Sequence, residues 1–252
     1  MVDRRLFLGG ALALPLLGHA AGPAKAQSGG SSGAGGAGPD AAREDAIVPL
    51  ADYMLGTRQA DLPAGALATT RAQLHDAVGV ALAGHGEDGV RQLRELGAEI
   101  GGRGESVVWG SGLRLPAHEA ARLNAAMSHA LEYDDTFGPG FIHPSAIIFP
   151  AALAVADLVG GVSGAELLAT ATVANDIACR MAMAGQPGVD GFAVGWHNTT
   201  LVGYLVAALV AGRLLGLDRA QLVNAAGIAS HQAAGNAQSH IDGALTKRLG
   251  PG

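Results

Sequence analysis

The stretch SAIIFPAALAVADLVG, residues 145–160, is apolar on almost every face of the helix that its composition favours. A second run, TTLVGYLVAALVAGRLLG at residues 199–216, has the same character. A helix without a polar face is stable only when neighbouring helices or subunits cover it on several sides. These two segments therefore predict the interior of a helical bundle or a subunit interface.

Around these two segments, apolar residues recur at the spacing of one helical face. The pattern predicts further helices at residues 43–55, 68–84, 88–101, 116–133, 163–185 and 218–235. Alternating strand patterns are nearly absent, so the sequence predicts an all-α fold.

Residues at the ends of these segments have the chemistry of helix caps. The expected N-caps are Asp88, Ser163 and Asp218, whose side-chain oxygens can accept hydrogen bonds from free backbone N–H groups. The expected helix ends are Gly160, Gly185 and Gly216, because glycine readily adopts the left-handed conformation that ends a helix.

The N-terminal residues divide into a predicted signal peptide, residues 1–26, and a Gly/Ser-rich linker, residues 27–42. Arg4 and Arg5 precede an apolar run at residues 6–17, which is much shorter than the roughly 20 residues of a membrane span. Small residues at Ala24 and Ala26 suit signal peptidase. The twin arginine favours a Tat-type signal and a periplasmic protein without stable membrane insertion after cleavage. An ordinary Sec signal or an uncleaved anchor is the alternative.

Charge and cysteine content exclude several classes of protein. The formal charge of −6, without any basic run, argues against a nucleic-acid partner. Cys179 is the single cysteine, so neither an internal disulfide nor a cysteine-held iron–sulfur cluster is possible. Its apolar helical surroundings favour a small buried side chain with no chemical role.

The segment EYDDTFGPGFIHP, residues 132–144, gathers carboxylates and a histidine in a chain with 15% charged residues. We expect a helix to close over His129 to Tyr133, with the acidic residues at its end. Carboxylates there face the negative end of the helix dipole, which is unfavourable. A functional use would explain them, and a solvated acidic turn that caps the next helix is the alternative.

Two further segments carry candidate functional residues. GWHNTT, residues 195–200, contains His197, and the alternative is that Asn198 or Thr199 caps the next helix and His197 has no role. GALTKRLGPG, residues 243–252, contains Lys247, for which a solvated basic tail is the alternative. The isolated histidines His231 and His240 are expected to have structural or surface roles.

Five strings together resemble the MmgE/PrpD family, which includes 2-methylcitrate dehydratase, cis-aconitate decarboxylase and iminodisuccinate epimerase. They are LHDAVGVALAG at 74–84, AARLNAAMSHALEYDDTF at 120–137, HPSAIIFPAALAVAD at 143–157, GWHNTT at 195–200 and DGALTKRLGPG at 242–252. The resemblance implies an MmgE/PrpD-type helical domain over residues 43–252, incomplete, and without the α/β lid domain that members carry.

The resemblance also implies site residues, position by position. The implied catalytic residues are His143, His197 and Glu132, and the implied substrate-binding residues are Thr136, Lys247 and Asp135. Glu132 replaces an aspartate of the family, and Gly250 stands where members often have histidine. Asp134 or Asp135 is expected to brace the loop.

The implied activity is that of a lyase, a dehydratase or decarboxylase, or of an epimerase. The implied substrate is a small di- or tricarboxylate, and the family resemblance implies no cofactor and no metal. Members are typically homodimers, so a homodimer is expected here. The alternative is an inactive helical module for dimerisation or scaffolding.

Overall fold

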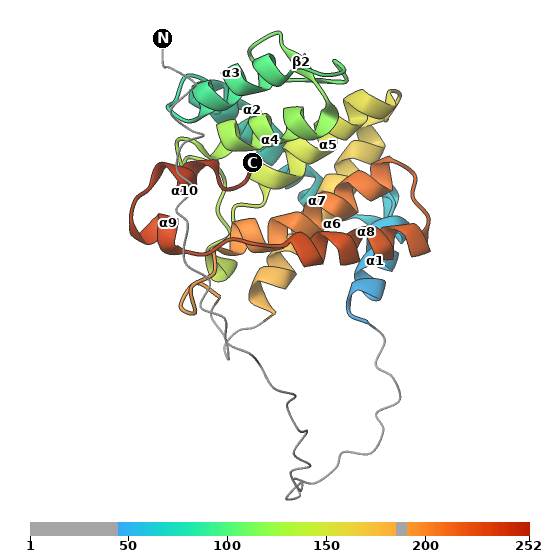
Figure 1. The fold of residues 1–252 in the computed structure, drawn as a ribbon. Helices are drawn as coiled ribbons and strands as arrows, with labels where there is room; N and C mark the ends of the chain where they lie inside the picture. Colours follow the sequence, from blue (N-terminus) through green and yellow to red (C-terminus); the bar gives the residue numbers. More distant parts are fainter. Residues whose placement is uncertain (1–44, 185–190) are drawn as a thin grey trace, which may run out of the picture. The chain divides into compact units, whose positions relative to one another are not determined.

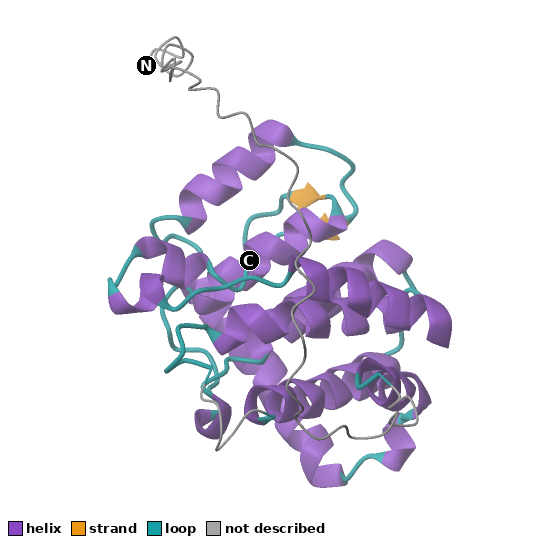
Figure 2. Ribbon diagram, turned by 60° about the horizontal axis from the view of Figure 1, so that its bottom comes forward, coloured by secondary structure: helices purple, strands orange, loops and turns teal. Residues whose placement is uncertain are grey.

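The computed structural model describes residues 45–184 and 191–252, and within them the fold is almost entirely helical (Figures 1 and 2). The prediction of an all-α fold is confirmed. The predicted signal peptide, the linker and Gly185 lie outside the described residues. The α-helices are α1 Ile47–Gly56, α2 Ala64–Gly84, α3 Val90–Ile100, α4 Ala117–His129, α5 Ser145–Val159, α6 Gly164–Met183, α7 Asn198–Leu214, α8 Arg219–Gln232, α9 Gln238–Ile241 and α10 Leu245–Leu249.

Shorter elements connect these helices. Two 3-10 turns, η2 Gln59–Asp61 and η3 Gly138–Gly140, precede α2 and α5. Strands β1 Ser106–Val107 and β2 Arg114–Leu115 form a small antiparallel hairpin between α3 and α4.

Helix α5 lies in the core, as its apolar sequence predicts. It packs against α4, α6 and α7, and its Ala146, Ile148, Phe149 and Ala152 are essentially inaccessible to solvent. A second apolar cluster joins α3 and α4 to the hairpin through residues such as Leu115. The long helices thus form a frame. The segments that connect them carry candidate site residues such as His143 and His197.

Two of the three predicted N-caps are confirmed. Ser163 and Asp218 each accept a hydrogen bond from a backbone N–H three residues further on, at 3.1 and 2.9 Å. The prediction for Asp88 is wrong, because Gly89, at φ 87°, turns the chain and α3 begins at Val90. Asp88 instead pairs with Arg91 on the surface.

Two helix ends predicted from glycine are confirmed, and the helix end predicted at Tyr133 is wrong. Gly160 and Gly216 follow α5 and α7 with φ of 69° and 74°, as predicted. The predicted helix through Tyr133 is wrong at its end, because α4 stops at His129. Glu132 adopts φ 55°, a left-handed conformation that is uncommon outside glycine and cannot continue an α-helix.

None of the helices in the described part of the chain combines the length and hydropathy needed to span a bilayer.

Candidate functional site

The loop between α4 and α5 forms one wall of the candidate site. Phe137 and Ile142 pair through their backbones, so the intervening Gly-Pro-Gly segment is a tight turn. The Asn198 amide at the start of α7 donates a hydrogen bond to the Gly140 carbonyl at 2.7 Å. The loop is therefore tied to the element that carries the second predicted histidine.

Asp135 braces this loop from inside the domain. Its Oδ1 accepts a hydrogen bond from the Ser145 backbone N–H at 3.1 Å, and its Oδ2 accepts one from the Gln73 side chain at 2.9 Å. Burial raises the pKa of Asp135, and these hydrogen bonds oppose that rise. Because both carboxylate oxygens already have partners, the geometry fits a bracing role better than the implied role in substrate binding.

His143 lies at the end of this loop with its Nδ1 inside a polar cluster. Nδ1 is 3.1 Å from the Asp135 carbonyl and 3.2 Å from the Thr136 hydroxyl. The His143 backbone N–H donates to the Thr199 hydroxyl at 3.1 Å, which attaches the loop to α7. Burial lowers the pKa of His143, which favours the neutral imidazole, and the nearby Asp134 carboxylate opposes this.

His197 is the residue at the N-cap position of α7, which corrects the alternative in which Asn198 or Thr199 caps the helix. Its backbone N–H donates to the Gly235 carbonyl at 2.9 Å, beside a bridge between Trp196 and Asn236. Its Nδ1 lies 2.9 Å from the Thr200 hydroxyl. Burial, together with the nearby histidines and Lys247, lowers the pKa of His197 to about 4.

Lys247 in α10 reaches the same region and pairs with Glu132. Their Nζ and Oε2 atoms are 2.7 Å apart, and the lysine side chain is only 8% exposed whereas the glutamate is 43% exposed. Burial raises the pKa of Glu132, but the hydrogen bond and the charge of Lys247 outweigh burial, so the pKa is lowered. The alternative of a solvated basic tail is therefore wrong for Lys247.

The structure brings five of the six predicted residues into one polar cluster, through the Glu132–Lys247 ion pair, the Thr136–His143 contact and the influence of Lys247 on His143 and His197. It also adds His129, for which the sequence predicted no role, and it pairs His129 with Asp134, which was expected only as one of two possible braces of the loop. His129 and Asp134 are completely buried, and their Nδ1 and Oδ2 atoms are 2.8 Å apart. The His129 ring lies 4.7 Å from that of His143 and 6.4 Å from that of His197.

His240 extends this row of imidazoles. Its ring centroid is 6.4 Å from that of His197 and 5.0 Å from that of Phe192. The sequence offered one signal for the buried pair, a histidine at a helix end five positions before an aspartate. It offered none for His240, whose position depends on the pairing of Trp196 with Asn236.

His129, Asp134 and His143 have donor atoms that all lie within 4.8 Å of one another. Such spacing occurs among metal ligands, but two of these side chains already share a hydrogen bond of 2.8 Å. The arrangement is described most simply as a hydrogen-bonded network around His143.

Cys179 on α6 is half-buried, and its thiol lies 3.5 Å from the Asn175 side-chain oxygen. Burial, and then the charges of Asp135 and Asp176, raise the pKa of this thiol to about 11. The thiolate that nucleophilic chemistry requires is therefore scarce at neutral pH.

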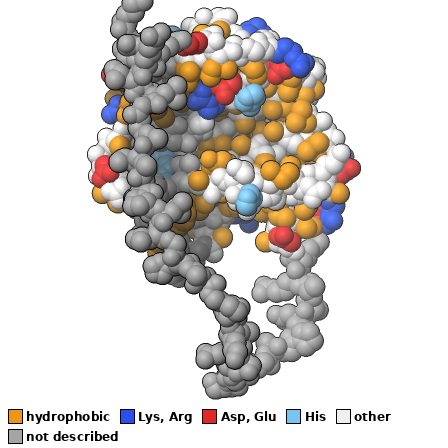
Figure 3. All heavy atoms as spheres, in the orientation of Figure 1, with side chains coloured by type: hydrophobic (Ala, Val, Ile, Leu, Met, Phe, Trp, Pro, Cys, Tyr) orange, Lys and Arg blue, Asp and Glu red, His pale blue; other side chains and the backbone are white. Residues whose placement is uncertain are grey.

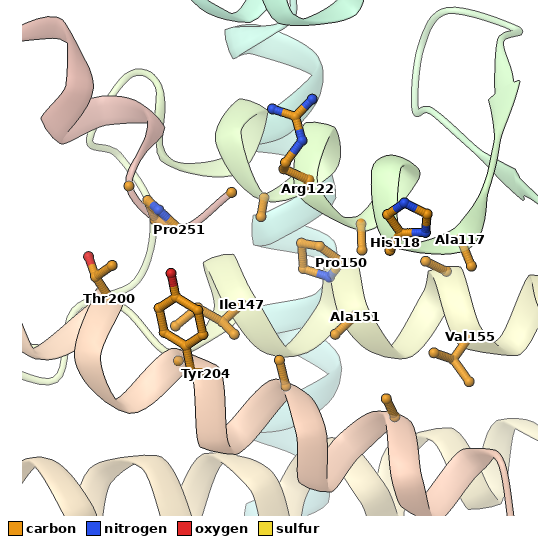
Figure 4. Close-up of a pocket in the computed structure, with 18 of the residues that line it drawn as sticks. Ala117, His118, Arg122, Ile147, Pro150, Ala151, Val155, Thr200, Tyr204 and Pro251 are labelled. Atoms are coloured by element: carbon orange, nitrogen blue, oxygen red, sulfur yellow. The ribbon is translucent and has the colours of Figure 1, made fainter. Parts of the chain in front are cut away.

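An open groove with a volume of about 510 Å³ runs along α4, α5 and α7, and it is lined in part by Thr199 and Thr200, whose hydroxyls contact His143 and His197 (Figure 4). Its walls are mainly apolar, with Ile147, Ala151 and Val155 from α5 and Tyr204 from α7. Figure 3 shows hydrophobic side chains gathered across the middle of this face. None of the six predicted site residues lines the groove.

Fold and site together define a helical domain that brings His143 and His197, whose pKa values are lowered, close to the buried Lys247 of α10. The sequence profile described as the MmgE/PrpD N-terminal domain matches residues 48–252, and the chain belongs to the MmgE/PrpD family. The resemblance noted from the motifs is confirmed.

The curated relatives that the chain matches include cis-aconitate decarboxylases. The chain is 27% identical to the cis-aconitate decarboxylase-like protein oryM of Aspergillus oryzae, over 79% of this chain and 42% of that protein. It is 27% identical to cis-aconitate decarboxylase of Mus musculus, over 73% and 38% of the two chains. For the enzyme of Aspergillus terreus the identity is 32%, over 56% and 29%. The chain thus spans less than half the length of these relatives.

Proposed function

We propose that this chain forms the helical wall of the active site in a cofactor-independent enzyme that acts on a small di- or tricarboxylate. The reaction class is that of a lyase, either a dehydratase or a decarboxylase, or of an epimerase. One observation carries the proposal. His143 and His197, two histidines with lowered pKa values, lie on the same wall as the buried cation of Lys247.

These groups suit chemistry next to a carboxylate. A neutral imidazole can accept the proton of an adjacent C–H bond and become an imidazolium, and an imidazolium can donate its proton to the carbanion that remains after carbon dioxide has left. Lys247 and the Thr136 hydroxyl would hold a substrate carboxylate and stabilise the negative charge that develops. A substrate carboxylate would compete with Glu132 for Lys247, which is a reasonable exchange because Glu132 is partly exposed.

The test uses the protein encoded by the whole reading frame, incubated with cis-aconitate, citrate and 2-methylcitrate and followed by proton NMR. His143→Ala, His197→Ala and Lys247→Ala are compared at matched stability with His231→Ala, which removes an exposed histidine from α8. We expect each site variant to lose about 10²–10⁴-fold in turnover and the control to retain it. Near wild-type turnover in all three site variants would reject the site.

The groove along α4, α5 and α7 favours a second role, in which the domain acts as a homodimerisation module. A large, open, mainly apolar surface is typical of an interface rather than of a monomer surface. Light scattering at micromolar concentration tests this role, with a dimer as the expected result. A dimer without turnover on any polycarboxylate would support a scaffold in place of an enzyme.

A further inference from the structure

Asp134 lies between two imidazoles at the most buried point of the site. Its Oδ2 is 2.8 Å from His129 Nδ1 and 3.5 Å from His143 Nδ1. The side chains of His129 and Asp134 are both 0% exposed. The carboxylate is thus shielded from water while it faces the ring that the proposed function uses as a base.

The hydrogen-bond partners of His143 decide which of its nitrogens carries the proton. The Asp135 carbonyl, 3.1 Å from Nδ1, can only accept a hydrogen bond. The Thr136 hydroxyl lies 3.2 Å from the same Nδ1, and its oxygen lone pairs can accept a hydrogen bond from it. The Asp135 carbonyl and the Asp134 carboxylate therefore require hydrogen on Nδ1, and the Thr136 hydroxyl is compatible with it. In the neutral ring, Nε2 then keeps a lone pair for proton transfer.

His129 in turn fixes Asp134. A carboxylate oxygen accepts hydrogen bonds, so at 2.8 Å the His129 Nδ1 is the donor. His129 is the last residue of α4, a helix that is packed against α5 and α2, and its ring therefore has a rigid support. The other polar atoms of this pair, His129 Nε2 and Asp134 Oδ1, are buried and have no hydrogen-bond partner. Burying such atoms has a free-energy cost, which a functional role would explain.

We propose that Asp134, held by His129, is a positioning residue that keeps His143 in the tautomer with hydrogen on Nδ1. The inference rests on the proposed function only in giving His143 the role of a base. Asp134 and His129 do not themselves exchange protons with the substrate in this scheme. They orient the His143 ring, favour one tautomer and stabilise the imidazolium that forms when Nε2 accepts a proton.

The decisive measurement is the tautomer of His143, read from ¹⁵N chemical shifts in a long-range ¹⁵N–¹H correlation spectrum at neutral pH. The 252-residue chain is used, and His143→Gln assigns the signals. We expect hydrogen on Nδ1 in the wild-type chain. Asp134→Asn places an amide donor beside Nδ1, so we expect the populations to shift toward hydrogen on Nε2. Asp88→Asn, an exposed aspartate on the surface, is expected to leave the tautomer unchanged.

Two variants at His129 separate positioning from simple stability. Asparagine can present a donor near the place of the imidazole Nδ1, so His129→Asn should keep the His143 tautomer, whereas His129→Leu should lose it. Circular dichroism establishes which variants are folded. Hydrogen on Nε2 of His143 in the wild-type chain would overturn the proposal, and this test needs no variant. A folded Asp134→Asn chain with an unchanged tautomer would overturn it as well.

Activity of the whole protein gives a second readout. Asp134→Asn should lower kcat by roughly 10²–10⁴-fold with little change in KM, because proton transfer is affected and carboxylate binding is not. A protein that acts on no polycarboxylate, yet shows the expected tautomer, would reject the proposed function and leave the positioning role intact. An active protein with the opposite tautomer would reject the positioning role alone.

Discussion

The pKa of His197 depends on its burial and on the charges around it. His197 occupies the N-cap position of α7, a long apolar helix. Its neighbours carry or acquire positive charge, and they include Lys247 and His143. Burial and these charges disfavour the imidazolium, so the pKa falls from an ordinary value near 6.5 to about 4. The folded protein therefore binds fewer protons than the unfolded chain between these two pH values.

This difference in proton binding predicts how stability depends on pH. Stability rises with pH wherever the unfolded state binds more protons, so the His197 contribution is complete above about pH 6.5 and is lost as pH falls toward 4. We expect a decrease of roughly 1–3 kcal/mol in the free energy of unfolding across this window. Urea titrations at several pH values measure it.

His197→Gln should flatten this pH dependence, and His143→Gln should flatten it partly because the pKa of His143 is also lowered. The exposed His231 offers a matched control, since His231→Gln should retain the wild-type dependence. An unchanged pH dependence in the His197 variant would assign the proton uptake to other groups.

At the residue scale, the sequence predicted which side chains gather at the candidate site but not what holds them there. His143, His197 and Lys247 follow from motifs, because their positions match a family pattern. The roles of His129 and Asp134 do not follow from motifs, because the 2.8 Å contact between their side chains depends on where α4 ends. The left-handed backbone of Glu132 sets that end. Glutamate rarely adopts this conformation, and no residue type in the segment predicts it.

At the scale of elements, α5 and α7 pack closely where Gly203, which has no side chain, faces Ile147. A Cβ added at Gly203 would lie 2.8 Å from Ile147 Cδ1, inside van der Waals contact. Glycine at this point lets the two helices approach closely. The same substitution at Gly79, on the exposed side of α2, would meet nothing within 4 Å.

Replacing each of these two glycines with alanine should change the free energy of unfolding in opposite directions. Gly203→Ala should lower the free energy of unfolding by about 1–3 kcal/mol, because the helices must separate or Ile147 must move. Gly79→Ala should raise it by about 0.5–1 kcal/mol, because alanine favours the helix and the site is open. Urea denaturation of both variants measures the difference. Equal effects would show that the α5–α7 approach is not limited by this glycine.

The sequence predicted elements better than their ends. Apolar residues on all sides of α5 and α7 indicated burial, and both helices lie in the core. Ser163 and Asp218 were predictable caps because their side chains act within one turn. Asp88 was not, because Gly89 follows it and its positive φ moves the helix start to Val90. The hairpin β1–β2 is too short, at two residues a strand, to show an alternating pattern.

At the scale of the whole molecule, we propose that the protein is exported by a Tat-type pathway into the periplasm and cleaved after Ala26. The basis is the twin arginine Arg4-Arg5 with its short apolar run, in residues outside those that the structure describes. N-terminal sequencing of protein from a periplasmic fraction is expected to begin near Gln27. Arg4→Lys with Arg5→Lys should retain the precursor in the cytosol. Export of that variant through the Sec pathway would favour the alternative signal.

Helix α1 is held by residues far along the chain. Arg219 in α8 pairs with Asp52 across a separation of 167 residues, and Arg213 donates to the Met54 carbonyl across 159. A ribosome adds about 5–20 residues per second, so roughly 10–30 s pass between synthesis of α1 and arrival of its partners. During that time the nascent α1 exposes the apolar face that includes Ala51 and Met54, which the finished domain buries completely. A chaperone bound to this apolar face would protect α1 while translation continues.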